Sequence, residues 1–110
     1  MAYDEELADR VRGHLQHQDG VGERTMFGGL AFLVGGHMAV AASSRGGLMV
    51  RCDPAGAEEL LSGAGVERFE MGGRTLGGWL HVDAEAVADD ADLQRWIGVG
   101  VRQVATLPPA

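Results

Sequence analysis

Three short apolar runs separated by turn residues constrain this chain more than any other feature. The first two runs are joined by Gly35-Gly36, a link that suits the tight turns between antiparallel strands because glycine adopts a positive φ without steric cost. The second and third runs are joined by four turn-forming residues, 43–46. An antiparallel meander of three strands is therefore predicted, over residues 25–34, 37–42 and 47–52.

Counting from these two turns also predicts which residues face one another. The expected cross-strand pairs are Val34 with His37, Leu33 with Met38, Phe32 with Ala39, Ala31 with Val40, Ala41 with Leu48, Ala39 with Val50, and His37 with Cys52. Because side chains alternate along a strand, one face is expected to carry Leu30, Phe32, Val34, Ala39, Ala41, Leu48 and Val50. The other is expected to carry Ala31, Leu33, Met38, Val40, Met49 and Arg51. Both faces are too apolar for water, so each is expected to be covered by helices, by a second copy of the chain or by a ligand.

Helices are predicted on both sides of the meander. Leu7, Val11 and Leu15 follow one another at four-residue steps, which predicts an amphipathic helix over residues 4–18. Asp53-Pro54 is a typical helix start, with aspartate as the N-cap and proline at the first helical position, and predicts a short helix that ends at residue 60 or 61.

The last helix is the most regular. Asp83 caps a short helical turn over residues 84–88, and Asp89 or Asp90 caps a longer helix that runs to about residue 106. Gly98 and Gly100 interrupt this helix at a cost of about 1 kcal/mol each relative to alanine, which close packing of a bare backbone against the sheet would explain. Its apolar positions recur at steps of three and four residues: Leu93, Trp96, Ile97, Val101 and Val104.

These elements define an α+β fold in one domain, residues 1–110. A small antiparallel sheet, the three-strand meander plus one or two more strands, is expected to be packed with helices from the N- and C-terminal ends. Residues 75–82 predict one further strand, with Trp79 and Leu80 on opposite faces, and residues 66–71 predict a short strand or an extended loop. A length of 110 residues with 45% hydrophobic content is ordinary for one such domain.

The charged residues exclude several functions. Nine basic residues, all of them arginine, stand against sixteen acidic ones, a net charge of −7. Direct nucleic-acid binding is disfavoured because an acidic chain repels phosphate backbones. Without lysine, Schiff-base catalysis, attachment of pyridoxal phosphate and a Walker A loop are excluded. No cofactor is therefore expected.

The remaining composition points to a cytoplasmic protein. Cys52 is the single cysteine and cannot form an internal disulfide, and the acidic residues 1–6 do not resemble a signal peptide. No apolar run approaches the ~20 residues that a membrane-spanning helix needs.

Two groups of side chains are candidates for a catalytic or metal-binding site. The expected register places His37 beside Cys52, an arrangement typical of a nucleophile and its base, yet a buried structural cysteine is the simpler interpretation. His14 and His17 lie three residues apart on the first helix, but no third ligand lies close in sequence, and histidines there also complement the helix dipole. We therefore expect no enzyme activity and no metal site.

Arginines near the meander form the leading candidate for binding. Arg24 precedes the first apolar run, Arg51 lies in the third, and Arg74 lies in a glycine-rich turn that can return to the sheet. Together with Phe27, Gly28 and Gly29 they would form a site for an anion or an acidic partner. Ordinary ion pairing with the sixteen carboxylates is the competing interpretation.

The segment Arg24-Thr25-Met26-Phe27-Gly28-Gly29-Leu30-Ala31-Phe32 resembles the amino-terminal domain of the TfoX/Sxy competence-regulator family. The likeness continues through Gly36-His37-Met38, Gly47-Leu48-Met49-Val50-Arg51 and Trp79-Leu80-His81-Val82, and covers nearly the whole chain. It implies an α+β domain without known catalytic activity. Full-length relatives regulate natural competence genes with other transcription factors and carry a second helical domain, whereas this sequence ends at Ala110, so the resemblance implies a stand-alone form.

Together these observations predict a non-enzymatic, cytoplasmic regulatory or protein-interaction module, linked by resemblance to transcription or competence regulation. Its partner is expected to be another protein, with a homodimer through the second sheet face as a further expectation. The alternative is a small-ligand or anion-binding domain that uses Arg24, Arg51 and Arg74 beside the glycine-rich first strand.

Overall fold

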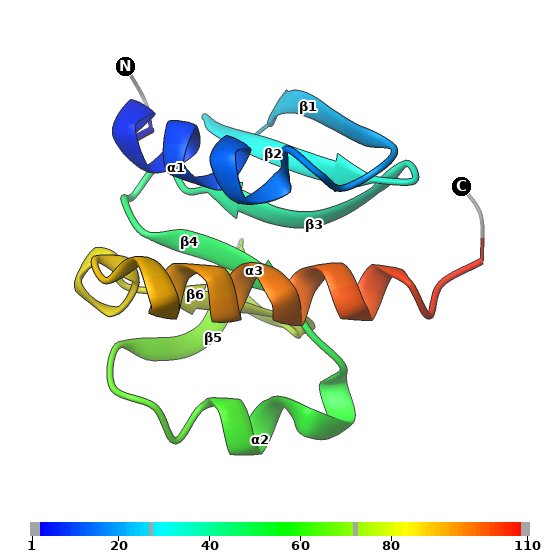
Figure 1. The fold of residues 1–110 in the computed structure, drawn as a ribbon. Helices are drawn as coiled ribbons and strands as arrows, with labels where there is room; N and C mark the ends of the chain where they lie inside the picture. The colour runs from blue at the N-terminus through cyan, green and yellow to red at the C-terminus, as the bar shows by residue number, and fades with distance from the viewer. Residues whose placement is uncertain (1–2, 27, 72, 109–110) are drawn as a thin grey trace.

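A computed structural model describes residues 3–26, 28–71 and 73–108 and shows an antiparallel sheet with helices on one side (Figure 1). The sheet has six strands in the order β1-β2-β3-β4-β6-β5. Their bounds are β1 Val21–Met26, β2 Gly29–Val34, β3 His37–Ala42, β4 Leu48–Arg51, β5 Val66–Met71 and β6 Arg74–Val82. The helices are α1 Glu5–Leu15, α2 Ala57–Leu60 and α3 Asp90–Val104, with short 3₁₀ turns at Pro54–Gly56 and Ala84–Val87. The predicted α+β class is confirmed.

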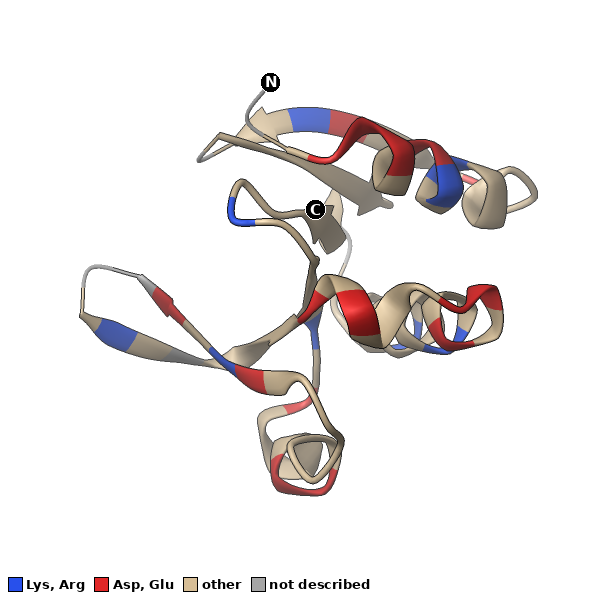
Figure 2. Cartoon of the chain, turned by 90° about the vertical axis from the view of Figure 1, so that its left-hand side faces the viewer, with Lys and Arg blue, Asp and Glu red and all other residues tan. Residues whose placement is uncertain are grey.

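The main core lies between the sheet and the helices α1 and α3, which pack on the same face (Figures 1 and 2). α3 crosses β3 and β4, while α2 packs near β6 at the other end of the same face. The largest fully buried side chains of this core are Phe32, Leu48, Leu80, Leu93, Val11, Val40, Val50, Val82 and Val87. None of the described helices is long and apolar enough to cross a membrane.

The helices begin where the capping residues predict. Asp4 Oδ1 accepts hydrogen bonds from the backbone N–H groups of Glu6 and Leu7, at 3.0 and 3.2 Å. Asp89, rather than Asp90, caps α3 and accepts from the Ala91 N–H at 2.8 Å. Each cap satisfies donors that the first helical turn leaves without a partner, so these boundaries follow from local sequence alone.

The first predicted strand is wrong in one respect: residues 25–34 form two strands, not one. The chain turns between β1 and β2, where Gly28 has a φ of 77°. Gly29 then lies so close to the Ala42 carbonyl oxygen that a side chain there would collide with it. Gly28 therefore lies in a hairpin turn and Gly29 begins β2, so the sheet gains β1 as an edge strand. Residues 66–71 form β5, so the strand interpretation is confirmed over the loop.

The predicted register is correct only at the start of the β2–β3 hairpin. Val34 pairs with His37 and Leu33 with Met38, but Phe32 then pairs with Val40. Ala39 is thus the extra residue of a β-bulge, and beyond it every side chain of β3 changes face. Val40 joins the core beneath the helices and Ala41 turns to the opposite face.

The expected alignment of β3 with β4 is also wrong, because the turn between these strands is one residue longer than predicted. Val40 pairs with Val50 and Ala41 with Met49, one position away from the expected pairs of Ala41 with Leu48 and Ala39 with Val50. The pairing of Ala42 with Leu48 leaves five residues, 43–47, in the turn rather than the four predicted, so the expected placement of His37 opposite Cys52 is wrong.

An ion pair joins α1 to the edge strand β1 and makes a pH-dependent contribution. Arg12 binds the Glu23 carboxylate through two nitrogens, at 2.6 and 3.0 Å, and this hydrogen bonding, with the added charge of Arg12, lowers the pKa of Glu23. A lowered pKa stabilises the fold above the pKa of the unfolded state, about 4.3, and this stabilisation is lost as the pH falls through the folded value. We expect Glu23→Gln to lower the free energy of unfolding by about 0.5 kcal/mol at neutral pH and by almost nothing near pH 2.

Urea denaturation at the two pH values measures this difference. Asp19→Asn is the matched control, because it removes the same charge from an exposed side chain that forms no ion pair among the described residues. If Glu23→Gln lowered the free energy of unfolding equally at both pH values, this result would contradict the role given to the ion pair.

Candidate functional site

The sheet face opposite α1 and α3 carries a second apolar cluster, here called the open face. The described helices pack on the other side of the sheet, so this face is bordered only by strands and loops (Figure 2). Its members come from β1 to β6, which places them in one layer although they are distant in sequence. Four are buried (Ala31, Ala41, Met49 and Phe69) and four are partly buried (Met26, Leu33, Met38 and Trp79).

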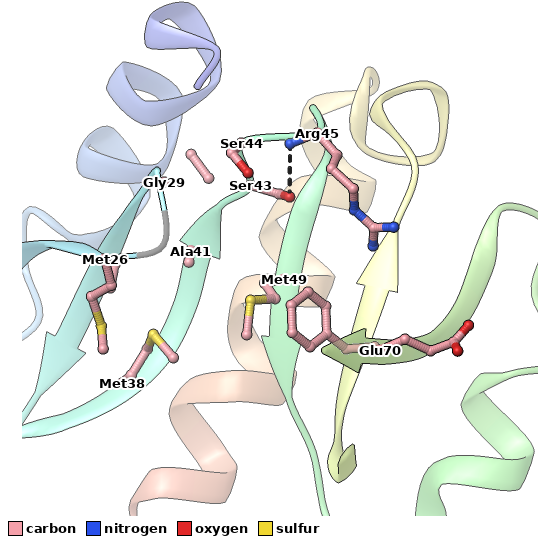
Figure 3. A pocket seen from close by; sticks show the side chains of 12 residues that line it. Met26, Gly29, Met38, Ala41, Ser43, Ser44, Arg45, Met49 and Glu70 are labelled. Carbon is pink, nitrogen blue, oxygen red and sulfur yellow. Dashed lines mark hydrogen bonds between the residues drawn. The ribbon is translucent and has the colours of Figure 1, made fainter. Parts of the chain in front are cut away.

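A hollow of about 230 Å³ lies at the centre of the open face. Ala31 and Ala41 line it with small side chains, while the three methionines Met26, Met38 and Met49 line it with long, flexible thioethers (Figure 3). Methionine adapts its shape to a partner at little cost, so this lining suits an irregular apolar surface.

Phe69 and Arg45 form one wall of the hollow. Phe69 lies in β5 between the pairs Arg68–Leu80 and Glu70–Thr75, where the register shifts, and packs with Met49. The Arg45 guanidinium lies 5.8 Å from the centroid of the Phe69 ring, within the range of a cation–π interaction. An apolar wall and a positive charge thus adjoin each other.

The loop that carries Arg45 is held in place by hydrogen bonds from both sides. The Arg45 N–H donates to Ser43 Oγ at 3.2 Å (Figure 3). The buried His81 places its Nε2 2.8 Å from the Gly46 carbonyl oxygen, so this nitrogen carries the proton and donates. Gly47 follows at a φ of 75° and packs against the Val82 carbonyl, which leaves no room for a side chain. Arg45 therefore projects from a fixed loop.

Two further arginines belong to the open face. Arg51 stacks on Trp79, with its guanidinium 4.9 Å from the ring centroid, and donates to the Met38 carbonyl at 3.3 Å. Arg24 is exposed on β1 and pairs with Ala31 of the cluster, which places both side chains on the same face of the sheet. The open face thus combines an apolar floor with guanidinium groups at its margin.

The structure brings together only part of the predicted arginine site. Arg51 and Arg74 line one shallow hollow beside Trp79. Arg24 lies on β1, three strands from β4, a backbone separation of about 14 Å at ~4.8 Å per strand. The three arginines therefore do not converge on a single anion. Of the glycines, Gly28 lies in the β1–β2 turn and Gly29 lines the central hollow, while Phe27 lies outside the described residues.

The candidate nucleophile and its base lie in different surroundings. Cys52 is 1% exposed, within the helix-covered core, and burial raises the pKa of its thiol. His37 lies at the sheet margin, where its Nε2 is 2.6 Å from the Pro108 carbonyl oxygen. The histidine therefore helps to hold the segment after α3 and does not activate the cysteine.

His14, one of the two histidines considered as metal ligands, forms a structural contact. His14 Nε2 lies 3.0 Å from Asp90 Oδ1, which joins the end of α1 to the start of α3, and this hydrogen bond lowers the pKa of Asp90. Within the described ranges, no three His, Cys, Asp or Glu side chains lie together in an arrangement that holds a metal ion.

Arg45, Phe69 and the methionines were not among the predicted site residues. The alternation of β6 and the spacing of Met38 and Met49 indicated a second apolar face, but Phe69 reaches it only because β5 pairs outside β6. In the sequence Arg45 is one of four turn-forming residues, and no local pattern predicts its contact with Phe69. Arg45 and Phe69 come together only through the pairing of β4 with β6 and of β6 with β5.

The fold and the site define a class: a small α+β domain whose antiparallel sheet is covered by helices on one face and presents an apolar, arginine-bordered face on the other. Residues 13–104 match the family model of the TfoX N-terminal domain. The chain therefore belongs to the TfoX N-terminal domain family, which confirms the resemblance found in its sequence. No curated protein and no solved structure gives a significant match.

Proposed function

We propose that this chain is a non-enzymatic regulatory module that binds another protein through the open face. The observation that carries the proposal is the apolar cluster itself, which includes the partly buried Met26, Leu33, Met38 and Trp79 on the side of the sheet opposite the described helices. Contiguous apolar surface of this kind marks an interaction site in soluble proteins. Its methionines and aromatic rings are the residue types enriched at protein interfaces.

The chemistry of this surface supports binding rather than catalysis. Its floor consists of aliphatic, thioether and aromatic side chains, which neither transfer protons nor attack a carbonyl group. The one nucleophile and base considered from the sequence, Cys52 and His37, are separated, and the thiol is buried with a raised pKa. A raised pKa keeps the thiol protonated and unreactive.

Membership of the TfoX N-terminal domain family supports the regulatory part of the proposal. The proposed setting is the cytoplasm, in keeping with a single unpaired cysteine. The proposal includes a link to transcription or competence regulation, and this link rests on family membership alone.

Affinity capture from the protein's own cell extract tests the proposal, with Met38→Asp as the key variant. The aspartate replaces this partly buried thioether with a carboxylate and so places a charge within the open face. The partner recovered by the wild-type chain is therefore expected to be lost. Gln94→Asp is the matched control: it adds the same charge at an exposed position of α3 and is expected to recover the partner like the wild type.

Urea denaturation of both variants shows whether they remain folded, and we expect each to lose about 1 kcal/mol or less because neither position is fully buried. Equal recovery of the partner by wild type and Met38→Asp would place the binding surface elsewhere. Recovery of the chain alone, in every sample, would contradict a protein partner.

A further inference from the structure

Four of the nine arginines form ion pairs with carboxylates: Arg10 with Asp90, Arg12 with Asp9 and Glu23, Arg68 with Glu58, and Arg95 with Asp92. In the parts of the chain that the structure describes, the other five form no ion pair with a carboxylate. Arg102 lies on α3 and Arg74 begins β6, whereas the remaining three, Arg24, Arg45 and Arg51, belong to the open face. Carboxylates are not scarce, since the chain has sixteen acidic residues. The charge of these three guanidinium groups is therefore left uncompensated.

All three of these arginines border the open face. Arg24 shares its side of the sheet with Ala31, Arg45 lies over Phe69, and Arg51 lies over Trp79. Stacking on a ring occupies the face of a guanidinium group and leaves most of its N–H donors free for an acceptor. Acidic segments occur along the helices on the other side, although β5 also carries some (Figure 2). The open face thus presents positive charge on a protein whose net charge is −7.

We propose that the open face binds an amphipathic α-helix of a partner protein, with apolar residues in the methionine-lined hollow and aspartate or glutamate residues along its flank. This inference rests on the proposed function and adds the chemistry of the partner. Carboxylates on the helix would bind the free N–H groups of Arg24, Arg45 and Arg51, and such charge-assisted hydrogen bonds are stronger than neutral ones. Glu70 also lines the hollow, from β5, so carboxylates of the helix are expected at the three arginines and not at Glu70.

The dimensions of the sheet suit a helix. A row of paired residues crosses all six strands, from Arg24 through Ala31, Ala41, Met49 and His81 to Glu67. Five strand spacings give a length of roughly 24 Å, which a helix of about 16 residues spans. The small Ala31 and Ala41 are the second and third residues of this row, and their short side chains allow a helix to approach closely there.

A second copy of the chain fits the same surface less well. Two open faces brought together would offer Glu67 and Glu70 as partners for Arg24, Arg45 and Arg51 of the other copy, so part of the positive charge would stay uncompensated in the interface, which opposes association. The wild-type chain is therefore expected to be a monomer in light scattering.

Fluorescence anisotropy with three labelled synthetic peptides of about 18 residues tests the inference. The first carries a leucine and methionine stripe flanked by glutamate, the second has lysine in place of each glutamate, and the third is the glutamate peptide with two central prolines that prevent a helix. The glutamate peptide is expected to bind at least about ten-fold more tightly than either of the others, and to weaken as salt is raised.

Charge reversal on the protein provides the matched pair of variants. Arg45→Glu is expected to lower the affinity of the protein for the glutamate peptide by about ten-fold. Arg102→Glu, the same change at an exposed position of α3, is expected to change this affinity by no more than about two-fold. Arg24→Glu is expected to act like Arg45→Glu, and its exposed position on an edge strand keeps the fold intact.

Three results would overturn the inference: equal or tighter binding of the lysine peptide, equal binding of the proline peptide, or equal effects of Arg45→Glu and Arg102→Glu. A dimer that dissociates in Met38→Asp would identify a second copy as the occupant instead. These failures are separate from failure of the proposed function, because partner capture that is sensitive to Met38→Asp would still show that the open face binds a protein.

Discussion

Replacing Phe32 with alanine is expected to lower the free energy of unfolding by about 4 kcal/mol, the middle of the range for a buried phenylalanine. Phe32 lies in the middle of β2, is 0% exposed and packs among the residues between the sheet and the helices. Its ring also lies 6.0 Å from the Arg12 guanidinium, so one position contributes both to the core and to the junction of α1 with the sheet. Since domains of this size are stable by only about 5–15 kcal/mol, urea denaturation should show a large shift of the midpoint.

Phe69→Ala is the informative comparison, because it removes the same ring from the open face. Phe69 is 8% exposed, but the ring lies at a hollow, where neighbouring methionines can move into the vacated space. Phe69→Ala is therefore expected to lower the free energy of unfolding by about 2 kcal/mol, at the low end for large-to-small substitutions. Equal losses for the two variants would show that the open face is as important to folding as the helix-covered core, and would weaken its interpretation as a binding surface.

The helices could be predicted from sequence because their signals are local. Asp4 and Asp89 cap helices by bonding to N–H groups two or three residues away, and the apolar steps of α1 and α3 follow the helical period. The alternation of β6 was local too: Leu80 faces the helices and Trp79 faces the open side. In each case the deciding contacts lie within a few residues of the sequence.

The bulge at Ala39 could not be predicted in this way. The Ala39 carbonyl lies against Gly100 of α3, so the backbone of β3 is shaped by a helix that follows sixty-one residues later. One extra residue there exchanged the faces of Val40 and Ala41, which moved a valine into the core and an alanine into the central hollow. The separation of His37 from Cys52 has a different cause, the β3–β4 turn that is one residue longer than predicted.

The candidate site was predictable only in outline. A second apolar face and the importance of arginine followed from strand alternation and composition, and Arg24 and Arg51 lie on that face. The partnership of Arg45 with Phe69 depends on β6 pairing with β4 and on β5 pairing outside β6, an order that differs from the sequence. The β3–β4 loop and β5 lie side by side because of the strand order, which short-range sequence patterns do not predict.

Gly100→Ala is expected to lower the free energy of unfolding by about 2 kcal/mol, as overpacking of a close-packed site usually does. A Cβ atom at this position would overlap the Ala39 carbonyl oxygen and lie 3.0 Å from both the Ala39 carbonyl carbon and Val40 Cγ1. The obstacle is mainly backbone, so α3 must move away from β3. This cost exceeds the gain of about 1 kcal/mol that alanine brings to a helix over glycine.

Gly13→Ala provides the matched control for this substitution. Gly13 lies in α1, is exposed, and a Cβ atom there would meet nothing within 4 Å, so alanine is expected to raise stability by about 1 kcal/mol. The midpoints of urea denaturation of the two variants should therefore shift in opposite directions from that of the wild type. Stabilisation by Gly100→Ala would show that α3 does not need its bare backbone against Ala39. It would also remove the explanation for the bulge, and with it the reason why Ala41, rather than Val40, lines the open face.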